Sequence, residues 1–95
     1  MSTEQQLWFT LDYGITTDTR LARLRRLERL SARFLALTLN IDTVFTEARL
    51  AKAKYRKIGV EVRKHTSQIK AAQLALILDE VLSDKDIERI EQAAR

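Results

Sequence analysis

The side chains that most often carry catalysis or bind metals are scarce: the sequence has one histidine, His65, and no cysteine. Without cysteine there is no thiol chemistry and no Cys-based zinc site, and a single histidine cannot build a His-based site alone. His65 also falls on an apolar stripe, so we expect a packed or hydrogen-bonded side chain and no catalytic base. If that stripe lies between subunits, His65 would make assembly sensitive to pH.

Carboxylates are more frequent, and a group of them could bind a divalent cation. Six acids lie within residues 79–91: Asp79, Glu80, Asp84, Asp86, Glu88 and Glu91. Their spacing matches no calcium loop, and no glycine stands where the turn of such a loop requires one. The sequence also lacks a glycine-rich phosphate loop. We therefore predict that the protein is not an enzyme and holds no metal and no cofactor.

Basic residues are concentrated in the middle of the chain. Residues 20–70 hold fourteen Lys or Arg and four acids, a net charge of +10, whereas residues 1–19 and residues 71–95 carry −3 each. A basic region of this kind is typical of a surface that meets phosphate. The acidic ends could cover that surface or pair with a second copy. The sequence predicts nucleic-acid contacts, to phosphates rather than to bases, from nine residues: Arg25, Arg26, Arg29, Arg33, Arg56, Lys57, Arg63, Lys64 and Lys70.

The elements that would position these residues are helices. The chain has 95 residues, enough for one domain, with no Pro and Gly only at positions 14 and 59. Because Gly and Pro mark most tight turns, their scarcity argues against an all-β fold. We predict a single all-α domain over 1–95, either a small helical bundle or a helical hairpin with a long second helix.

The first fifteen residues have a different pattern. Apolar residues alternate with others from Leu7 to Tyr13, and this period of two predicts a short extended arm over 1–15. Trp8 and Phe9 would contact a partner or a second copy. A first helix is expected over 18–39, ended by Asn40 in the left-handed conformation.

From Ile41 to Asp79, apolar positions follow a 3-4 spacing, which leaves two interpretations of residues 41–82. In the first, one continuous helix forms a coiled-coil seam or the long arm of a hairpin, and Gly59 costs about 1 kcal/mol inside it. In the second, the helix breaks near 63–66 and forms a helix-turn-helix. Gly59 then lets the two helices approach closely, Thr66 or Ser67 caps the second helix, and its exposed side reads a major groove through Ser67, Gln68, Lys70, Ala71 and Gln73.

Residues 50–70 carry a resemblance to a known family. The stretch from Leu50 to Gly59 resembles the helix-turn-helix variant found in regulators of conjugative elements. That family includes DNA-binding activators and small antiactivators that bind another regulator, so the resemblance implies either role. This sequence departs from the family pattern at the turn, where Arg63 and Lys64 stand in place of the usual glycine and apolar residue.

The remaining residues predict a short helix and an interface. Ser83-x-x-Asp86 has the form of a capping box and predicts a helix over 84–94. The run from Leu74 to Leu82 is apolar on several faces, which indicates burial between subunits in a homo-oligomer. The partner or oligomer interface would comprise Trp8, Phe9, Tyr55, Ile58, Val62, Ile69, Leu76 and Ile77.

The sequence thus predicts a small regulatory or accessory protein that acts by binding. Nucleic acid is the first expected partner, in transcription or DNA-transfer regulation. The alternative is a protein-protein interaction module, such as an antiactivator, chaperone or assembly adaptor, that uses apolar helical surfaces. No apolar run approaches the length of about 20 residues needed to span a bilayer, and no secretory signal is visible, so we expect a cytoplasmic protein without membrane contacts.

Overall fold

The computed structural model describes residues 15–65 and 68–95, with side chains from residue 19 onward. These residues form five helices and no strand, which confirms the predicted all-α class. The predicted arm over 1–15, with Trp8 and Phe9, lies almost wholly outside the described residues. The helices are α2 (Ile15–Leu35), α3 (Ile41–Glu47), α4 (Lys52–Arg63), α5 (Ala71–Val81) and α6 (Asp84–Ala93).

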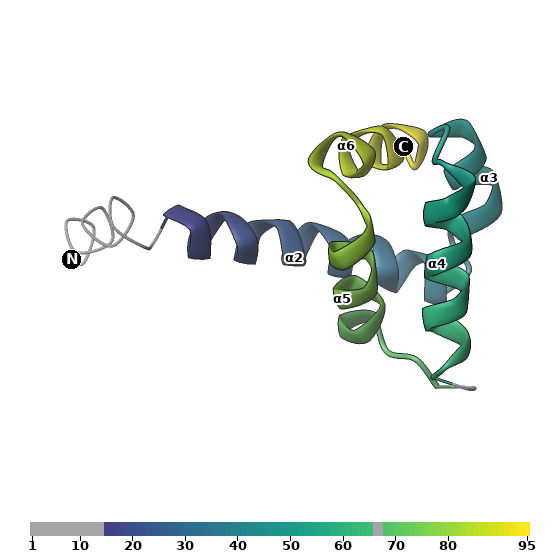
Figure 1. The fold of residues 1–95 in the computed structure, drawn as a ribbon, viewed down its shortest axis with the longest axis horizontal. Helices are drawn as coiled ribbons and strands as arrows, with labels where there is room; N and C mark the ends of the chain where they lie inside the picture. Colours follow the sequence, from purple (N-terminus) through teal and green to yellow (C-terminus); the bar gives the residue numbers. More distant parts are fainter. Residues whose placement is uncertain (1–14, 66–67) are drawn as a thin grey trace.

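Helix α2 is the longest element, and the other helices pack around its C-terminal half (Figure 1). Helix α5 contacts both α2 and α4, while α3 packs on α6. The N-terminal part of α2 projects from the rest of the molecule, and Leu21 there is 48% exposed. None of the helices described here is both long and apolar enough to cross a membrane.

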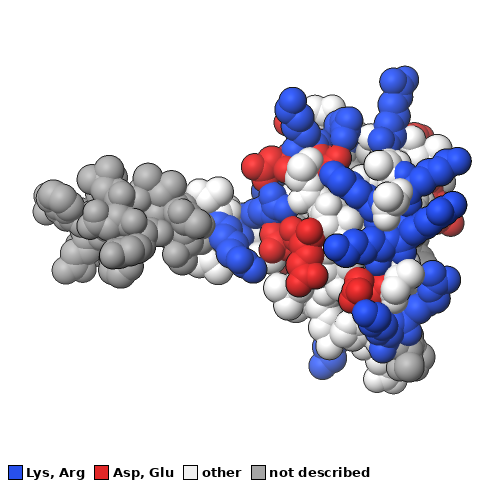
Figure 2. All heavy atoms as spheres, in the orientation of Figure 1, with Lys and Arg blue, Asp and Glu red and all other residues white. Residues whose placement is uncertain are grey.

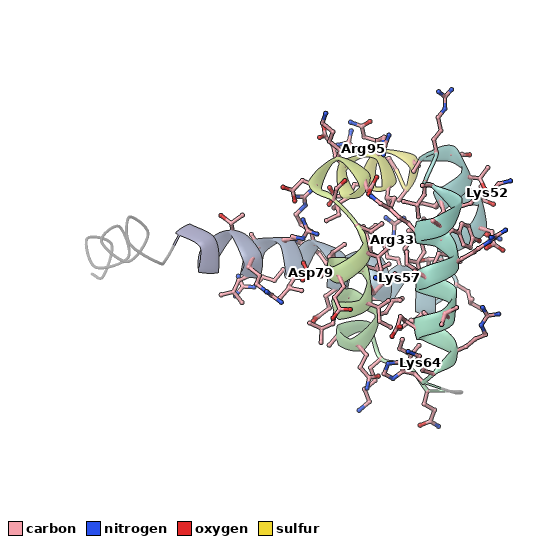
Figure 3. The ribbon with its side chains drawn as sticks, viewed as in Figure 1. Arg33, Lys52, Lys57, Lys64, Asp79 and Arg95 are labelled. Atoms are coloured by element: carbon pink, nitrogen blue, oxygen red, sulfur yellow. The ribbon has the colours of Figure 1, made fainter. Side chains whose placement is uncertain are left out.

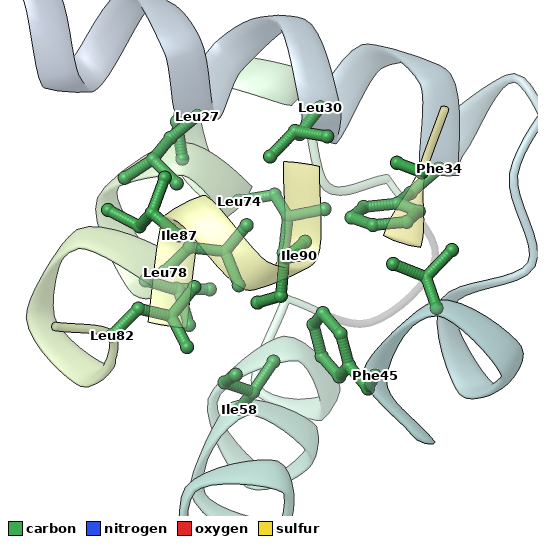
Figure 4. Close-up of a cluster of buried hydrophobic side chains, with 14 of the residues drawn as sticks. Leu27, Leu30, Phe34, Phe45, Ile58, Leu74, Leu78, Leu82, Ile87 and Ile90 are labelled. Atoms are coloured by element: carbon green, nitrogen blue, oxygen red, sulfur yellow. The ribbon is translucent and has the colours of Figure 1, made fainter. Parts of the chain in front are cut away.

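The core is built from apolar side chains of all five helices (Figure 4). Phe34 and Phe45 meet edge to face with ring centroids 5.8 Å apart, and Phe45 meets Tyr55 in the same way at 5.4 Å. Edge-to-face pairs of this kind add to the stabilisation that area burial gives. The most deeply buried aliphatic residues around them are Leu27, Leu78, Ile87 and Ile90.

Residues 41–82 form three helices, so the prediction of one continuous helix is wrong. The predicted break near 63–66 is present, because α4 ends at Arg63 and α5 begins only at Ala71. A second, unpredicted break over 48–51 separates α3 from α4. The 3-4 spacing of apolar residues therefore reflects several short amphipathic helices and not one seam.

Helix α2 ends before residue 39, and Asn40 has a different role from the predicted one. Leu37 adopts the left-handed conformation, with φ of 62°, and its N–H donates to the Phe34 carbonyl at 3.1 Å. The N–H of Thr38 donates to the Arg33 carbonyl at 3.0 Å, which completes a Schellman motif. Asn40 instead caps α3, because its side chain accepts a hydrogen bond from the Thr43 N–H at 3.1 Å.

Gly59 lies inside α4 and serves no close helix approach. A Cβ added there would meet only the Arg63 guanidinium, at 3.7 Å, which is an ordinary van der Waals distance. The predicted packing role for Gly59 is therefore wrong, and the glycine remains a helix-weakening residue.

The predicted interface residues mostly pack inside this one chain. Ile58 and Ile77 are buried, and Tyr55, Val62 and Ile69 are half-buried against the same core. The run from Leu74 to Leu82 is also covered internally, since Leu74, Ala75, Ile77, Leu78 and Leu82 are all buried. The helices α2, α4 and α6 cover this run, so its burial does not require a second subunit. Leu76 alone among the described members of the predicted interface is exposed.

Candidate nucleic-acid interface

The exposed side of α4, together with the residues at its two ends, carries a group of exposed cations. We call it the α4 basic face and define it as Arg49, Lys52, Arg56, Lys57, Arg63 and Lys64, all of which are exposed. Lys52 begins α4, and Lys64 lies just beyond its last residue (Figure 3). Ala53 and Val60 are exposed between these cations and are too small to hold a ligand away from the helix. Glu61 is the only acid in residues 52–64, and it pairs with Lys64 at 3.0 Å.

The local sequence explains why this side faces outward. Ile58 is buried in the core, and Tyr55 and Val62, three and four residues away, are half-buried on the same side of α4. Positions three or four apart share one face of a helix, so this stripe fixes the orientation of α4 and sends Arg56 and Val60 outward.

The turn before α4 is held by its backbone. Arg49 has φ of 56°, its N–H donates to the Thr46 carbonyl at 3.1 Å, and the Leu50 N–H donates to the Phe45 carbonyl at 3.0 Å. This is a second Schellman motif, which turns the chain within the four residues 48–51. A non-glycine residue in this conformation costs about 1–2 kcal/mol, so the tertiary packing must impose it.

Helix α6 anchors α4 from the inside. Asp86 is buried and accepts hydrogen bonds from the ammonium of Lys54 on α4, from Arg89 at 2.6 Å and from the Ser83 N–H at 3.0 Å. The Ser83 hydroxyl in turn accepts from the Asp86 N–H, so the predicted capping box is confirmed. Burial disfavours the charged carboxyl, but these hydrogen bonds outweigh it and hold the pKa of Asp86 well below its usual value.

The arginines of α2 divide into two groups, and only part of the predicted set is exposed and unpaired. Arg26 forms a two-pronged contact with Glu91 of α6, which lowers the pKa of Glu91 and raises that of Arg26. Arg23, which was not in the predicted set, bonds Asp79 at 2.7 Å and also Asp84. The acidic C-terminal helices thus neutralise one side of α2. Arg25, Arg29 and Arg33 are exposed on α2 and form no ion pair among the described side chains.

The helix that follows the predicted break does not present a basic surface. Of the residues expected to read a groove, Gln68, Lys70 and Gln73 are exposed and Ala71 is half-buried, while Ser67 lies outside the described residues. The Gln73 side chain accepts from the Lys70 N–H at 2.8 Å and so caps α5. The rest of the exposed side of α5 is Ala72, Leu76 and Glu80, which offers no cation to a phosphate.

Charge is separated across the molecule. On the face shown in Figure 2, Lys and Arg side chains gather over α4, whereas acidic side chains lie mainly over α5 and beside α6. The structure therefore brings together Arg56, Lys57, Arg63 and Lys64, and it adds Arg49 and Lys52, which are not among the residues predicted from the sequence. Lys52 stands four residues before Arg56 and so shares its side of a helix, which could have identified it, but no local signal marks Arg49.

The residues that could hold a metal or act as a base are not assembled into a site. No cluster of three or more His, Asp or Glu suited to a metal ion occurs among residues 15–65 and 68–95. His65 is exposed just beyond the end of α4, so the expectation of a packed histidine is wrong. No family model, no curated protein and no solved structure matches the chain.

Proposed function

We propose that this protein binds double-stranded DNA and that α3, the 48–51 turn and α4 act as a helix-turn-helix with α4 as its recognition helix. The α4 basic face is the observation that carries this proposal. A helix-turn-helix places its second helix in the major groove, with the first helix crossing the backbone. Helix α4 is about 18 Å long at 1.5 Å per residue, enough to lie along such a groove.

The residues of α4 suit two kinds of contact. Arg56 and Lys57, in the middle of the exposed side, suit hydrogen bonding to the acceptor atoms of guanine in the major groove. Ala53 and Val60 suit apolar contact with a thymine methyl group. Arg49, Arg63 and Lys64, at the two ends of the face, suit phosphate contacts that fix the position of the helix.

This assignment shifts the recognition helix from the one first predicted. The alternative role, a protein-binding module that uses the apolar C-terminal run, has less support because Leu74, Ile77 and Leu82 are buried in the chain's own core. We retain the cytoplasm as the proposed compartment and transcription or DNA transfer as the proposed process. A homo-oligomer also stays a prediction, and a dimer would bind two half-sites about one helical turn, roughly 34–36 Å, apart.

The test compares two variants that lose the same charge. We expect the wild-type protein to shift the fluorescence anisotropy of a random 20-base-pair duplex at 50 mM salt. R56Q/K57Q should bind between about fivefold and a hundredfold more weakly, and its log-log salt slope should be smaller by about 2. R25Q/K85Q removes two exposed cations outside α4 and should retain nearly the wild-type affinity.

Two results would contradict the proposal. The first is the absence of any anisotropy change at low salt with duplex DNA, since phosphate-driven binding is strongest there. The second is an equal loss of affinity in both double variants, because that would reflect net charge and not the α4 basic face.

A further inference from the structure

A second group of basic side chains lies outside α4, around a cleft between α2 and α6. Its volume is about 370 Å³, within the range of small-molecule sites. Leu30 and Ala94 supply its apolar lining, and its charged lining is Arg26, Arg29, Arg33, Arg95 and Glu91. Arg95 lies beside the C-terminal end of α6 (Figure 3).

The cations of this cleft exceed the acids that could neutralise them. Glu91 is the single acidic side chain of the lining, and Arg26 occupies both of its oxygens, with Nε 3.0 Å from Oε2. Arg33 donates only to the backbone carbonyl of Ala94, at 3.3 Å. Arg29 and Arg95 form no ion pair with any side chain in the described part of the chain. Three guanidinium groups therefore line one cleft without a carboxylate partner.

The electrostatics agree with this geometry. The pKa of Glu91 is lowered first by its hydrogen bonds from Arg26 and also by the charges of Arg29 and Arg95. These guanidinium groups consequently lie close enough to act on the same carboxylate. Glu91 stays ionised near neutral pH, and both of its oxygens are already held by Arg26.

We propose that the α2–α6 cleft binds a phosphate group, held by Arg29, Arg33 and Arg95. A guanidinium presents its donors in a planar fork that matches phosphate oxygens, and a phosphate has enough oxygens to accept from more than one arginine. The Arg26–Glu91 pair already holds one side of the cleft in place. Fewer side chains therefore lose conformational freedom when a ligand binds. The same chemistry would serve a small phosphorylated molecule or a phosphate of the DNA backbone.

The test uses inorganic phosphate as the probe. At pH 7 and constant ionic strength, replacing chloride with phosphate should raise the melting temperature of the wild-type protein in a saturable way. R29Q/R95Q should lose this rise, while K70Q/K85Q, which removes two exposed cations outside the cleft, should retain it. Titration of both variants with pyrophosphate by calorimetry provides a second readout that does not depend on stability.

The outcomes separate this proposal from the DNA-binding role of α4. The cleft proposal is overturned if the wild type gives no saturable response, or if R29Q/R95Q and K70Q/K85Q respond alike. R56Q/K57Q should still bind phosphate even if it no longer binds DNA.

The DNA assay then identifies the source of the phosphate. If R29Q/R95Q lowers the salt slope for duplex binding by about 2, the cleft holds backbone phosphate. If duplex binding is unchanged, the ligand is a small phosphorylated molecule.

Discussion

Serine residues at two positions of the fold have opposite effects on stability. The Ser31 side chain in α2 has no exposure to solvent, and its Oγ has no hydrogen-bond partner among the described residues. The Ser83 Oγ, in contrast, accepts from the Asp86 N–H at 3.2 Å and begins α6. A buried hydroxyl without a partner destabilises the fold, because its hydrogen bonds to water are lost and not replaced. A capping hydroxyl stabilises the fold, because it accepts a hydrogen bond from a free backbone N–H at the start of a helix.

Ser31→Ala should stabilise the protein. It removes an unpaired buried hydroxyl and places a better helix former inside α2, so we expect a gain of about 1 kcal/mol in the free energy of unfolding. The melting temperature of a domain of this size should rise by roughly 4–8 °C. Urea denaturation followed by circular dichroism measures the change.

Ser83→Ala is the matched control, because it deletes the same atom from a position where it caps a helix. It should lower stability by about 1 kcal/mol. A loss of stability in Ser31→Ala as well would mean that the Ser31 hydroxyl has a partner in solution, contrary to our interpretation.

At the scale of the helices, breaks that depend on local chemistry could be predicted and breaks imposed by packing could not. The start of α6 was predictable because Ser83 and Asp86 stand at capping-box spacing just before Ile87 and Ile90. The 48–51 turn reads Ala-Arg-Leu-Ala, four good helix formers, and contains no residue that favours the left-handed conformation. Packing of Phe45 and Leu50 on the core outweighs that preference.

Gly59→Ala should strengthen α4. Because the new Cβ would meet only the Arg63 guanidinium, the substitution restores helix propensity without a steric cost. We expect a gain of about 0.5–1 kcal/mol in the free energy of unfolding, measured by chemical denaturation.

DNA affinity serves as the control for Gly59→Ala. Gly59 is not part of the α4 basic face, so duplex binding should stay near that of the wild type. A destabilised Gly59→Ala protein would show instead that the glycine is needed for close packing, as the helix-turn-helix interpretation of residues 41–82 predicts.

At the scale of the whole molecule, the basic region could be predicted from the sequence. Which of its cations are exposed and which pair with acids of other helices could not. Arg56, Lys57, Arg63 and Lys64 were predicted as contacts and lie together on one exposed surface. Arg26 was predicted as a contact too, yet it pairs with Glu91, a residue 65 positions away. No local pattern reveals such a pair, because it depends on how α6 packs against α2.

These long-range pairs link the helices through charge. Asp86 on α6 holds Lys54 on α4, and Glu91 on α6 holds Arg26 on α2. Both carboxyl groups have a folded-state pKa below the ordinary value, which is 3.8 for Asp86 and 4.5 for Glu91. The unfolded chain therefore binds protons more readily than the folded chain in this range of pH.

These two carboxyl groups should consequently make stability decrease in acid. A group with a depressed folded pKa stabilises the fold fully above its unfolded pKa, and that contribution is lost as pH falls towards the folded pKa. We expect the urea midpoint to be nearly constant from pH 7 to about pH 5.5 and then to decrease steadily as the pH is lowered further. Asp86→Asn should be less stable than the wild type at pH 7 but lose less on acidification, because its side chain cannot titrate. Equal acid sensitivity in Asp86→Asn and the wild type would show that Asp86 does not link α6 to α4 in solution.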